Sequence, residues 1–191
     1  MMYCDYEKVL NMNNYKWLWI DCEMTGLDVN SELLLEVACY ISDKSLEDIL
    51  EGPDLIIHQP IEVLESMSEW CTDHHKESGL WDASLKSQID VAQAETSMIE
   101  FLDTIDKSKS DWVLAGNSVH HDKNFLHRFM PLLMQRCHYQ ILDVSSIAIM
   151  MRSWLKTQAF KKKQSHRAQD DILESIEELK FYKNQLCDIS E

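Results

Sequence analysis

Asp21 and Glu23 stand at the end of a short apolar run, residues 16–20, whose aromatic and branched side chains favour a buried strand. Strand side chains alternate between the two faces of a sheet, so these two carboxylates point to the same side. Like charges this close repel one another unless a cation neutralises them, and oxygen ligands suit Mg²⁺ or Mn²⁺. The pair indicates a divalent-cation site, with a solvated strand end as the alternative.

Three further residues could complete such a site. Asp122 begins a predicted helix, where the N-terminus favours an anion. His166 precedes the last predicted helix and Asp171 lies one turn inside it, so both can approach the same cations. Taken alone, Asp122 is typical of a helix cap and His166 of a surface loop. With Asp21 and Glu23 they make four carboxylates and a histidine, which is the ligand inventory of a two-metal phosphodiester hydrolase with its base.

The helices and strands that must position these residues are predicted from the spacing of apolar residues and from the positions of Gly, Pro and polar segments between them. Residues 33–42 and 49–58 predict two strands that form an antiparallel meander with the first, and residues 112–115 predict a further strand. Helices are predicted over residues 92–105, over 121–135 with an interruption at Pro131, and over 144–155. Residues 156–165 are polar and predict a loop before a final helix, whose apolar stripe comprises Ile172, Ile176, Leu179, Tyr182 and Leu186.

The composition bounds the class of protein. A chain of 191 residues with 45% hydrophobic and 27% charged residues predicts one ordinary folded domain. No apolar stretch approaches the roughly 18 to 20 residues that cross a bilayer. The N-terminus resembles neither a signal peptide nor a transit peptide, so we expect a cytoplasmic protein, with nuclear or mitochondrial forms as alternatives. The six cysteines form no Cys-x-x-Cys pair and predict buried thiols.

The net charge of −15 argues against a protein that grips long nucleic acid, because that mode of binding needs a basic surface. An enzyme that clusters carboxylates around cations and engages only a short piece of substrate can remain acidic.

Four motifs in this sequence resemble the oligoribonuclease family of DEDDh 3′→5′ exonucleases, and its eukaryotic members in particular. They are Trp-Ile-Asp-Cys-Glu-Met-Thr-Gly-Leu-Asp from Trp19, Ala-Gly-Asn-Ser-Val-His-His-Asp-Lys-Asn-Phe-Leu from Ala115, His-Tyr-Gln-Ile-Leu-Asp-Val-Ser from His138, and Ser-His-Arg-Ala-Gln-Asp-Asp-Ile from Ser165. The resemblance covers about residues 16–184. It implies an α/β fold of the RNase H-like kind, a mixed five-stranded sheet flanked by helices. It also implies a single exonuclease domain over residues 1–191, with residues 1–15 as an N-terminal extension.

The activity that this resemblance implies is a metal-dependent 3′→5′ exoribonuclease that degrades very short oligoribonucleotides to mononucleotides. Two divalent ions per site, Mg²⁺ or Mn²⁺, would be held by Asp21, Glu23, Asp122 and Asp171, with Asp21 bridging both. His166 would be the general base. The family spacing favours Asp171 over its neighbour Asp170 as the ligand.

The resemblance further implies a narrow substrate slot and a homodimer. Leu27 and Trp70 would stack against the bases. His75, Ser118 and Ser145 match positions that contact the substrate backbone or cap its 5′ phosphate. Tyr139 matches a tyrosine that the second subunit donates.

One residue departs from the family pattern. Gln140 stands where family members usually carry Arg. A guanidinium can make two charge-assisted hydrogen bonds to one phosphate, which an amide cannot. We therefore expect weaker recognition of a 5′ phosphate, for which the lysines at 161–163 could compensate.

Two other functions remain as alternatives. A DEDDh exonuclease could trim the 3′ ends of longer RNA or DNA. A degenerate member could persist as a non-catalytic, dimeric interaction protein, although clustered carboxylates that repel one another give a scaffold no advantage.

Overall fold

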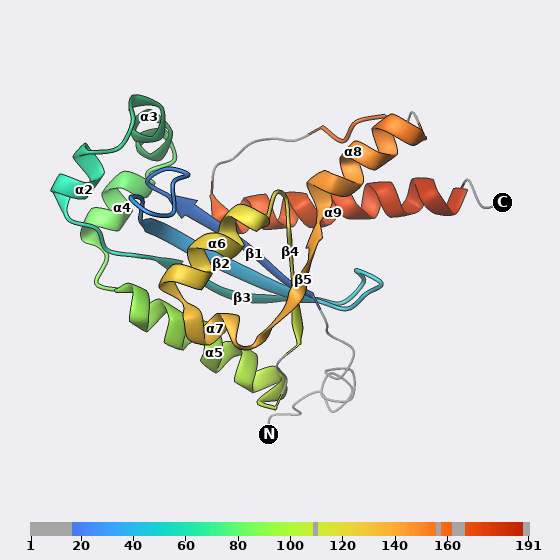
Figure 1. The fold of residues 1–191 in the computed structure, drawn as a ribbon, viewed down its shortest axis with the longest axis horizontal. Coiled ribbons are helices and arrows are strands. Elements are labelled where there is room, and N and C mark those ends of the chain that lie inside the picture. The colour runs from blue at the N-terminus through green and yellow to red at the C-terminus, as the bar shows by residue number, and fades with distance from the viewer. Residues whose placement is uncertain (1–16, 109–110, 156–157, 162–166, 189–191) are drawn as a thin grey trace, which may run out of the picture.

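The computed structural model describes residues 17–108, 111–155, 158–161 and 167–188 (Figure 1). Within them, one five-stranded mixed sheet has the strand order β3-β2-β1-β4-β5. The first three strands pair antiparallel, and β4 and β5 run parallel to β1. The strands are β1 (Trp17–Met24), β2 (Leu34–Ser42), β3 (Ile49–Ile56), β4 (Trp112–Gly116) and β5 (Cys137–Asp143).

Helices flank this sheet and connect its parallel strands. They are α2 (Ile61–Glu65), α3 (Glu69–Glu77), α4 (Leu80–Lys86), α5 (Val91–Asp106), α6 (His120–Phe129), α7 (Pro131–Met134), α8 (Val144–Trp154) and α9 (Ala168–Asp188). Pro131 occupies the first turn of α7, where its missing N–H costs nothing, so the predicted helix over 121–135 is indeed divided there. Asp90 caps α5 in a capping box with Gln93.

The two faces of β1 belong to different hydrophobic cores. Leu18, Ile20 and Cys22 pack with residues of α5, α6 and α7. Trp19 faces the other way and packs with residues of α8 and α9. Asp21 and Glu23 continue the alternation on the Trp19 side, so the sheet presents them to α9. Figure 1 shows α5 and α9 on opposite sides of the sheet.

The α/β fold with a mixed five-stranded sheet is the one that the sequence predicted. β1 extends through Asp21, Cys22 and Glu23 as predicted, because β2 pairs with it as far as Met24. Residues 137–143 form the fifth strand, β5, at the edge of the sheet. The sequence did not predict its bounds, because its exposed centre lacks an apolar pattern.

Several predictions concern residues or side chains that the structure does not describe: the extension over 1–15, the side chains of two of the six cysteines, and most of the loop over 156–165. The cysteines whose side chains are described are free thiols, and Cys22, Cys39 and Cys71 among them are buried. None of the described helices has both the length and the apolar character of a membrane span.

Candidate functional site

Three carboxylates meet where β1 faces the start of α9. One oxygen from each of Asp21, Glu23 and Asp171 lies within 4.8 Å of the others. Asp21 and Glu23 share a face because the buried Cys22 between them points into the opposite core. Asp171 belongs to the first turn of α9, whose backbone bond from Asp171 N to the Arg167 carbonyl begins the helix. Its neighbour Asp170 is exposed and is not part of the group.

Asp122 approaches the same end of β1 from the first turn of α6. Its side chain is buried, and its Oδ1 accepts a hydrogen bond of 2.9 Å from the backbone N–H of Cys22. This bond fixes the carboxylate beside Asp21 and Glu23, although Asp122 is separated from β1 by about a hundred residues of sequence. Its negative charge is the strongest of the neighbouring charges acting on Asp21.

Burial and mutual repulsion raise the pKa values of the carboxylates in this group. Burial, followed by the charges of Asp171, Glu36 and Asp122, raises the pKa of Glu23 to about 8. Burial likewise raises the pKa of Asp122 to about 7, although the N–H of Cys22 opposes the shift. The pKa of Asp21 lies well above its usual range for the same reasons. Buried oxygen ligands that repel one another fit a divalent cation such as Mg²⁺ or Mn²⁺.

Behind the cluster, a buried ion pair ties α9 to the sheet. Glu36 is fully buried on β2 directly opposite Glu23. Its carboxylate accepts bonds from Arg167, including one of 3.0 Å from Nε, and one of 3.1 Å from the backbone N–H of Ala168 at the start of α9. The guanidinium of Arg167 also lowers the pKa of Glu23, against the larger effects that raise it. Glu36 thus sets where α9 begins and, with it, where Asp171 lies.

The residues predicted to stack on bases lie on the exposed side of this site. Leu27 follows β1 with 71% of its surface exposed, and Trp70 on α3 is 63% exposed and stacked on the His74 ring. His75 is buried and donates from Nε2 to the carbonyl of Met24, a bond of 2.9 Å. That bond holds α3 against the end of β1, which brings Trp70 and Leu27 to the same end of the sheet.

Ser118 and Ser145 lie side by side in the structure. Their hydroxyl oxygens are 3.2 Å apart, and the backbone N–H groups of both residues donate to Oδ1 of Asp143. Ser118 adopts a left-handed backbone with φ of 52°, which turns the chain between β4 and α6. Ser145 also donates to the side-chain oxygen of Asn117. One carboxylate therefore joins the loop after β4 to the first turn of α8.

Tyr139 and Gln140 do not belong to the carboxylate cluster of their own chain. Both are exposed on β5, the edge strand two positions away from β1, and Tyr139 is 77% exposed. His166 lies outside the described residues, between the loop and α9.

Sequence reasoning missed two residues that support the site. Glu36 carries a signal that could have revealed it, because it is a carboxylate inside an otherwise apolar strand. Asn117 donates to Ser175 and Glu178 of α9, which links β4 to the helix that carries Asp171. Nothing in the sequence pattern distinguishes Asn117 from an ordinary turn residue after Gly116.

This chain is similar to known exonucleases over most of its length. The model of the RNase_T exonuclease family matches residues 18–179. Human mitochondrial oligoribonuclease (Homo sapiens) is 47% identical over 176 residues, which cover 90% of this chain and 73% of the human protein. An oligoribonuclease from Francisella tularensis is 43% identical over 172 residues, which cover 90% of this chain and 96% of the bacterial protein.

A solved structure shares the fold. Pop2p of S. pombe, in a form with Mg²⁺ and Mn²⁺ bound, superimposes with a TM-score of 0.58. The match covers 93% of this chain and 85% of Pop2p at 12% sequence identity. At that identity the likeness concerns the fold.

Proposed function

The chain belongs to the oligoribonuclease family of exonucleases, and on that premise we propose that it hydrolyses very short oligoribonucleotides from their 3′ ends to mononucleotides. The observation that carries the proposal is the convergence of Asp21 and Glu23 from β1 with Asp171 from α9, next to the buried Asp122. A site of this composition suits phosphodiester hydrolysis, because it can concentrate positive charge around a phosphate within an acidic protein.

Asp21, Glu23, Asp122 and Asp171 are the residues that would hold two divalent ions, Mg²⁺ or Mn²⁺. Bound there, the ions would supply the positive charge that lowers the pKa of an attacking water and stabilises the leaving 3′ oxygen. The chemistry of the donors supports this assignment, since all are carboxylates and three have raised pKa values without a cation. Asp21 would help to hold both ions.

The remaining steps belong to side chains of the protein. His166, as general base, accepts the proton of the attacking water at a ring nitrogen, which requires a neutral imidazole. The Cys22 N–H keeps Oδ1 of Asp122 oriented. The Glu36–Arg167 pair keeps the first turn of α9, and therefore Asp171, against β1.

Short substrates would be bound by the apolar and polar groups around this centre. Exposed Leu27 and Trp70 offer surfaces on which bases of any identity can stack. The paired hydroxyls of Ser118 and Ser145 are proposed to bind the substrate backbone. His75 would act in the same region, from its position against Met24.

A second subunit would complete the site. Tyr139 is exposed on β5, which is an edge strand among the described residues, and Ile149 and Trp154 expose large apolar surfaces on α8. Exposed aromatic side chains on and near such a strand support an interface with another copy of the chain. In that dimer, Tyr139 of one subunit would reach the substrate of the other.

The experiment that tests the function compares substrates of different length. The purified protein is incubated with Mn²⁺ and a 3′-labelled diribonucleotide or an RNA several times longer, and Asp21→Asn serves as the inactive control. Rapid cleavage of the diribonucleotide supports the proposal. Preference for the longer RNA would instead identify a 3′-trimming exonuclease, and cleavage of neither would identify an interaction protein.

Domain extent and cellular location are also proposals. We infer one exonuclease domain over residues 1–191 with residues 1–15 as an extension, which the family match over 18–179 supports. The name of the human relative makes the mitochondrion the alternative to the cytoplasm. Fractionation of cells that express the natural protein distinguishes the two locations.

A further inference from the structure

The loop between β1 and β2, residues 25–33, carries Leu27 next to the end of β1 that bears the carboxylates (blue in Figure 1). Leu27 is proposed to stack against a base, and 71% of its surface is exposed. Because little packing fixes so exposed a side chain, its position depends on the backbone on either side of it. The contacts that hold this backbone therefore decide where Leu27 lies.

Thr25 closes the loop at its base. Its backbone N–H donates to the carbonyl of Leu33, a bond of 3.0 Å, and its hydroxyl oxygen accepts a bond of 2.9 Å from the backbone N–H of Leu33. The same hydroxyl donates its own hydrogen to Oε2 of Glu32. Thr25 is buried, so water competes little for these bonds. The carboxylate of Glu32 thus fixes the hydroxyl that joins the two ends of the loop.

Glu32 also packs against the backbone one residue before Leu27. A Cβ atom added to Gly26 would lie 2.9 Å from the carboxyl carbon of Glu32 and 3.0 Å from its Cγ. Both distances are well inside the roughly 3.5 to 4.0 Å of ordinary carbon contact. Gly26 therefore provides the space into which the side chain of Glu32 folds.

Hydrogen bonds also define the chain on the other side of Leu27. The carbonyl of Asp28 accepts from the backbone N–H groups of Ser31 and Glu32, at 3.1 and 2.9 Å. The carboxylate of Asp28 accepts a bond of 2.9 Å from the backbone N–H of Asn30. Glu32 therefore bonds to the chain before Leu27 through its carboxylate and after Leu27 through its backbone N–H.

We propose that Glu32 is a positioning residue for the bases of the substrate: it holds the backbone around Leu27 in the conformation that stacks on a base. The inference rests on the proposed function, which gives Leu27 its stacking role. A loop that is ordered in advance loses little conformational entropy on binding, so more of the stacking energy appears as affinity. Without the side chain of Glu32, binding itself must order the loop.

The charge of Glu32 makes a positioning role distinguishable by the sign of its effect. Substrates of the proposed reaction are anionic, and a carboxylate near them repels the phosphate. If Glu32 acted only through its charge, its removal would strengthen binding. The positioning role predicts weaker binding for Glu32→Ala, which loses the hydrogen bond to Thr25. It predicts retained binding for Glu32→Gln, whose amide oxygen can still accept that bond.

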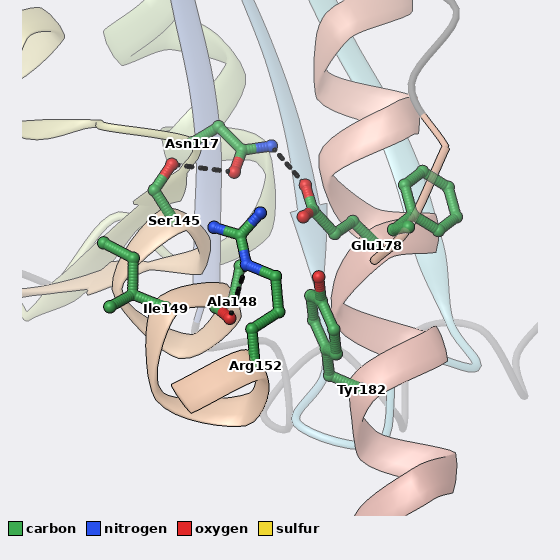
Figure 2. Close-up of a pocket in the computed structure, with 8 residues that line it drawn as sticks. Asn117, Ser145, Ala148, Ile149, Arg152, Glu178 and Tyr182 are labelled. Atoms are coloured by element: carbon green, nitrogen blue, oxygen red, sulfur yellow. Dashed lines mark hydrogen bonds between the residues drawn. The ribbon is translucent and has the colours of Figure 1, made fainter. Parts of the chain in front are cut away.

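Another part of the site is held by separate residues. Figure 2 shows Asn117 between Ser145 and Glu178, with hydrogen bonds of 3.1 Å from Ser145 to Asn117 and 3.0 Å from Asn117 to Glu178. These bonds join the loop after β4 to α8 and α9, and none of the three residues belongs to the loop over 25–33. A change at Glu32 should therefore alter the binding of bases and leave the hydroxyls proposed to bind the substrate backbone in place.

The first experiment measures equilibrium affinity and needs no hydrolysis. Isothermal calorimetry of the full chain with Mg²⁺ compares a diribonucleotide analogue, in which a methylene group replaces the bridging 3′ oxygen, with the same sugar–phosphate backbone lacking both bases. The ratio of the two affinities measures base stacking. We expect Glu32→Ala to lower this ratio about tenfold and Glu32→Gln to stay within about twofold of the wild type. Glu47→Ala, which removes an exposed carboxylate from the turn after β2, is the matched control and keeps the wild-type ratio.

A double-mutant cycle tests whether Glu32 acts through Leu27. In a Leu27→Ala background, Glu32→Ala should lower the ratio by less than about twofold, because the surface that it positions is already gone. Equal losses in both backgrounds would overturn the proposal, as would an unchanged ratio in Glu32→Ala or a ratio near one in the wild type. Should Glu32→Ala fail to fold by circular dichroism, Gly26→Ala replaces it, because the added methyl group displaces the carboxylate. An unchanged ratio in Gly26→Ala overturns the proposal as well.

Metal binding and hydrolysis are measured separately. Titration of Mn²⁺ by electron paramagnetic resonance should give equal affinities in the wild type and in Glu32→Ala, because Glu32 is not among the grouped carboxylates. Weaker Mn²⁺ binding in Glu32→Ala would overturn the positioning role, since the effect on bases would then be indirect. Failure of the wild type to hydrolyse an ordinary diribonucleotide would contradict the proposed function, whereas the affinity ratio would still decide whether Glu32 positions a base-binding loop.

Discussion

Asp21 and Asp171 offer the most direct test of the carboxylate cluster, because one comes from a strand and the other from a helix. We expect Asp21→Asn and Asp171→Asn each to lower turnover by about a thousandfold or more, since an amide cannot hold a divalent cation as a carboxylate does. Thermal unfolding in a chelator should be unchanged or occur at a higher temperature, because each change relieves repulsion within the metal-free cluster.

Asp170→Asn is the matched control for this experiment. Asp170 neighbours Asp171 in sequence but is exposed and lies outside the cluster. Its removal should leave turnover within about twofold of the wild type, as for most surface substitutions. Full activity in purified Asp21→Asn protein would refute the assignment of the ligands.

The raised pKa of Glu23 links stability to pH. In the folded protein Glu23 titrates at about 8, whereas a glutamate in an unfolded chain titrates near pH 4.3. Its contribution to stability is therefore fully present below about pH 4 and is lost as the pH rises to about 8. We expect the free energy of unfolding in a chelator to decrease over this interval, and to decrease less in Glu23→Gln.

Saturating Mg²⁺ should reverse this dependence, because cation binding displaces protons from the cluster and becomes tighter as the pH rises. Chemical denaturation at several pH values, with chelator or with Mg²⁺, measures both effects. If the free energy of unfolding in a chelator depends on pH identically in the wild type and in Glu23→Gln, the titration of Glu23 does not control this stability.

At the scale of single residues, the sequence predicted those side chains whose position follows from periodicity. Asp21 and Glu23 share a face because a strand alternates. Asp171 was preferred over Asp170 on the spacing of the family motif, and not on helical periodicity. Glu36 was missed because its role depends on Arg167, about 130 residues away, and no local pattern records such a pairing.

The start of α9 is the element on which the cluster depends most. We expect Glu36→Gln to reduce stability by about 2 kcal/mol, because it leaves the guanidinium of Arg167 without its buried counter-charge. It should also weaken Mn²⁺ binding, since the first turn of α9 carries Asp171. Denaturant unfolding and an electron paramagnetic resonance titration of Mn²⁺ measure these effects.

Glu47→Gln is the corresponding control, because Glu47 is an exposed carboxylate in the turn after β2. A Glu36→Gln protein that loses stability yet binds Mn²⁺ like the wild type would show that the pair stabilises the fold without positioning Asp171.

The sequence predicts best those helices and strands whose apolar residues recur at a regular spacing. α5 begins and ends within one residue of its predicted bounds, because its apolar face and its Asp90 cap agree. β5 was harder to predict, because it is an edge strand with Tyr139 and Gln140 exposed. Such a strand lacks the run or alternation of apolar residues by which a buried strand is recognised in a sequence. The structure defines β5 through its pairing with β4, which depends on residues distant in the chain.

For the whole molecule, the proposed homodimer predicts a mass of twice 22.4 kDa by light scattering. We expect Trp154→Asp to lower that mass, because a charge would replace an aromatic surface in the interface. We expect Tyr139→Ala to retain the dimer but lose activity on short RNA. A monomer of full activity in the wild type would contradict the proposal.

The order in which the cluster's residues occur along the chain has a consequence during protein synthesis. Asp21 and Glu23 are translated early, Asp122 much later, and Asp171 only with α9. While α9 is still inside the ribosomal tunnel, the nascent chain has a strand with two carboxylates but lacks the helix that faces it. A growing polypeptide of this kind is surrounded by messenger and ribosomal RNA, yet cannot assemble the centre proposed to hydrolyse RNA until the helix emerges.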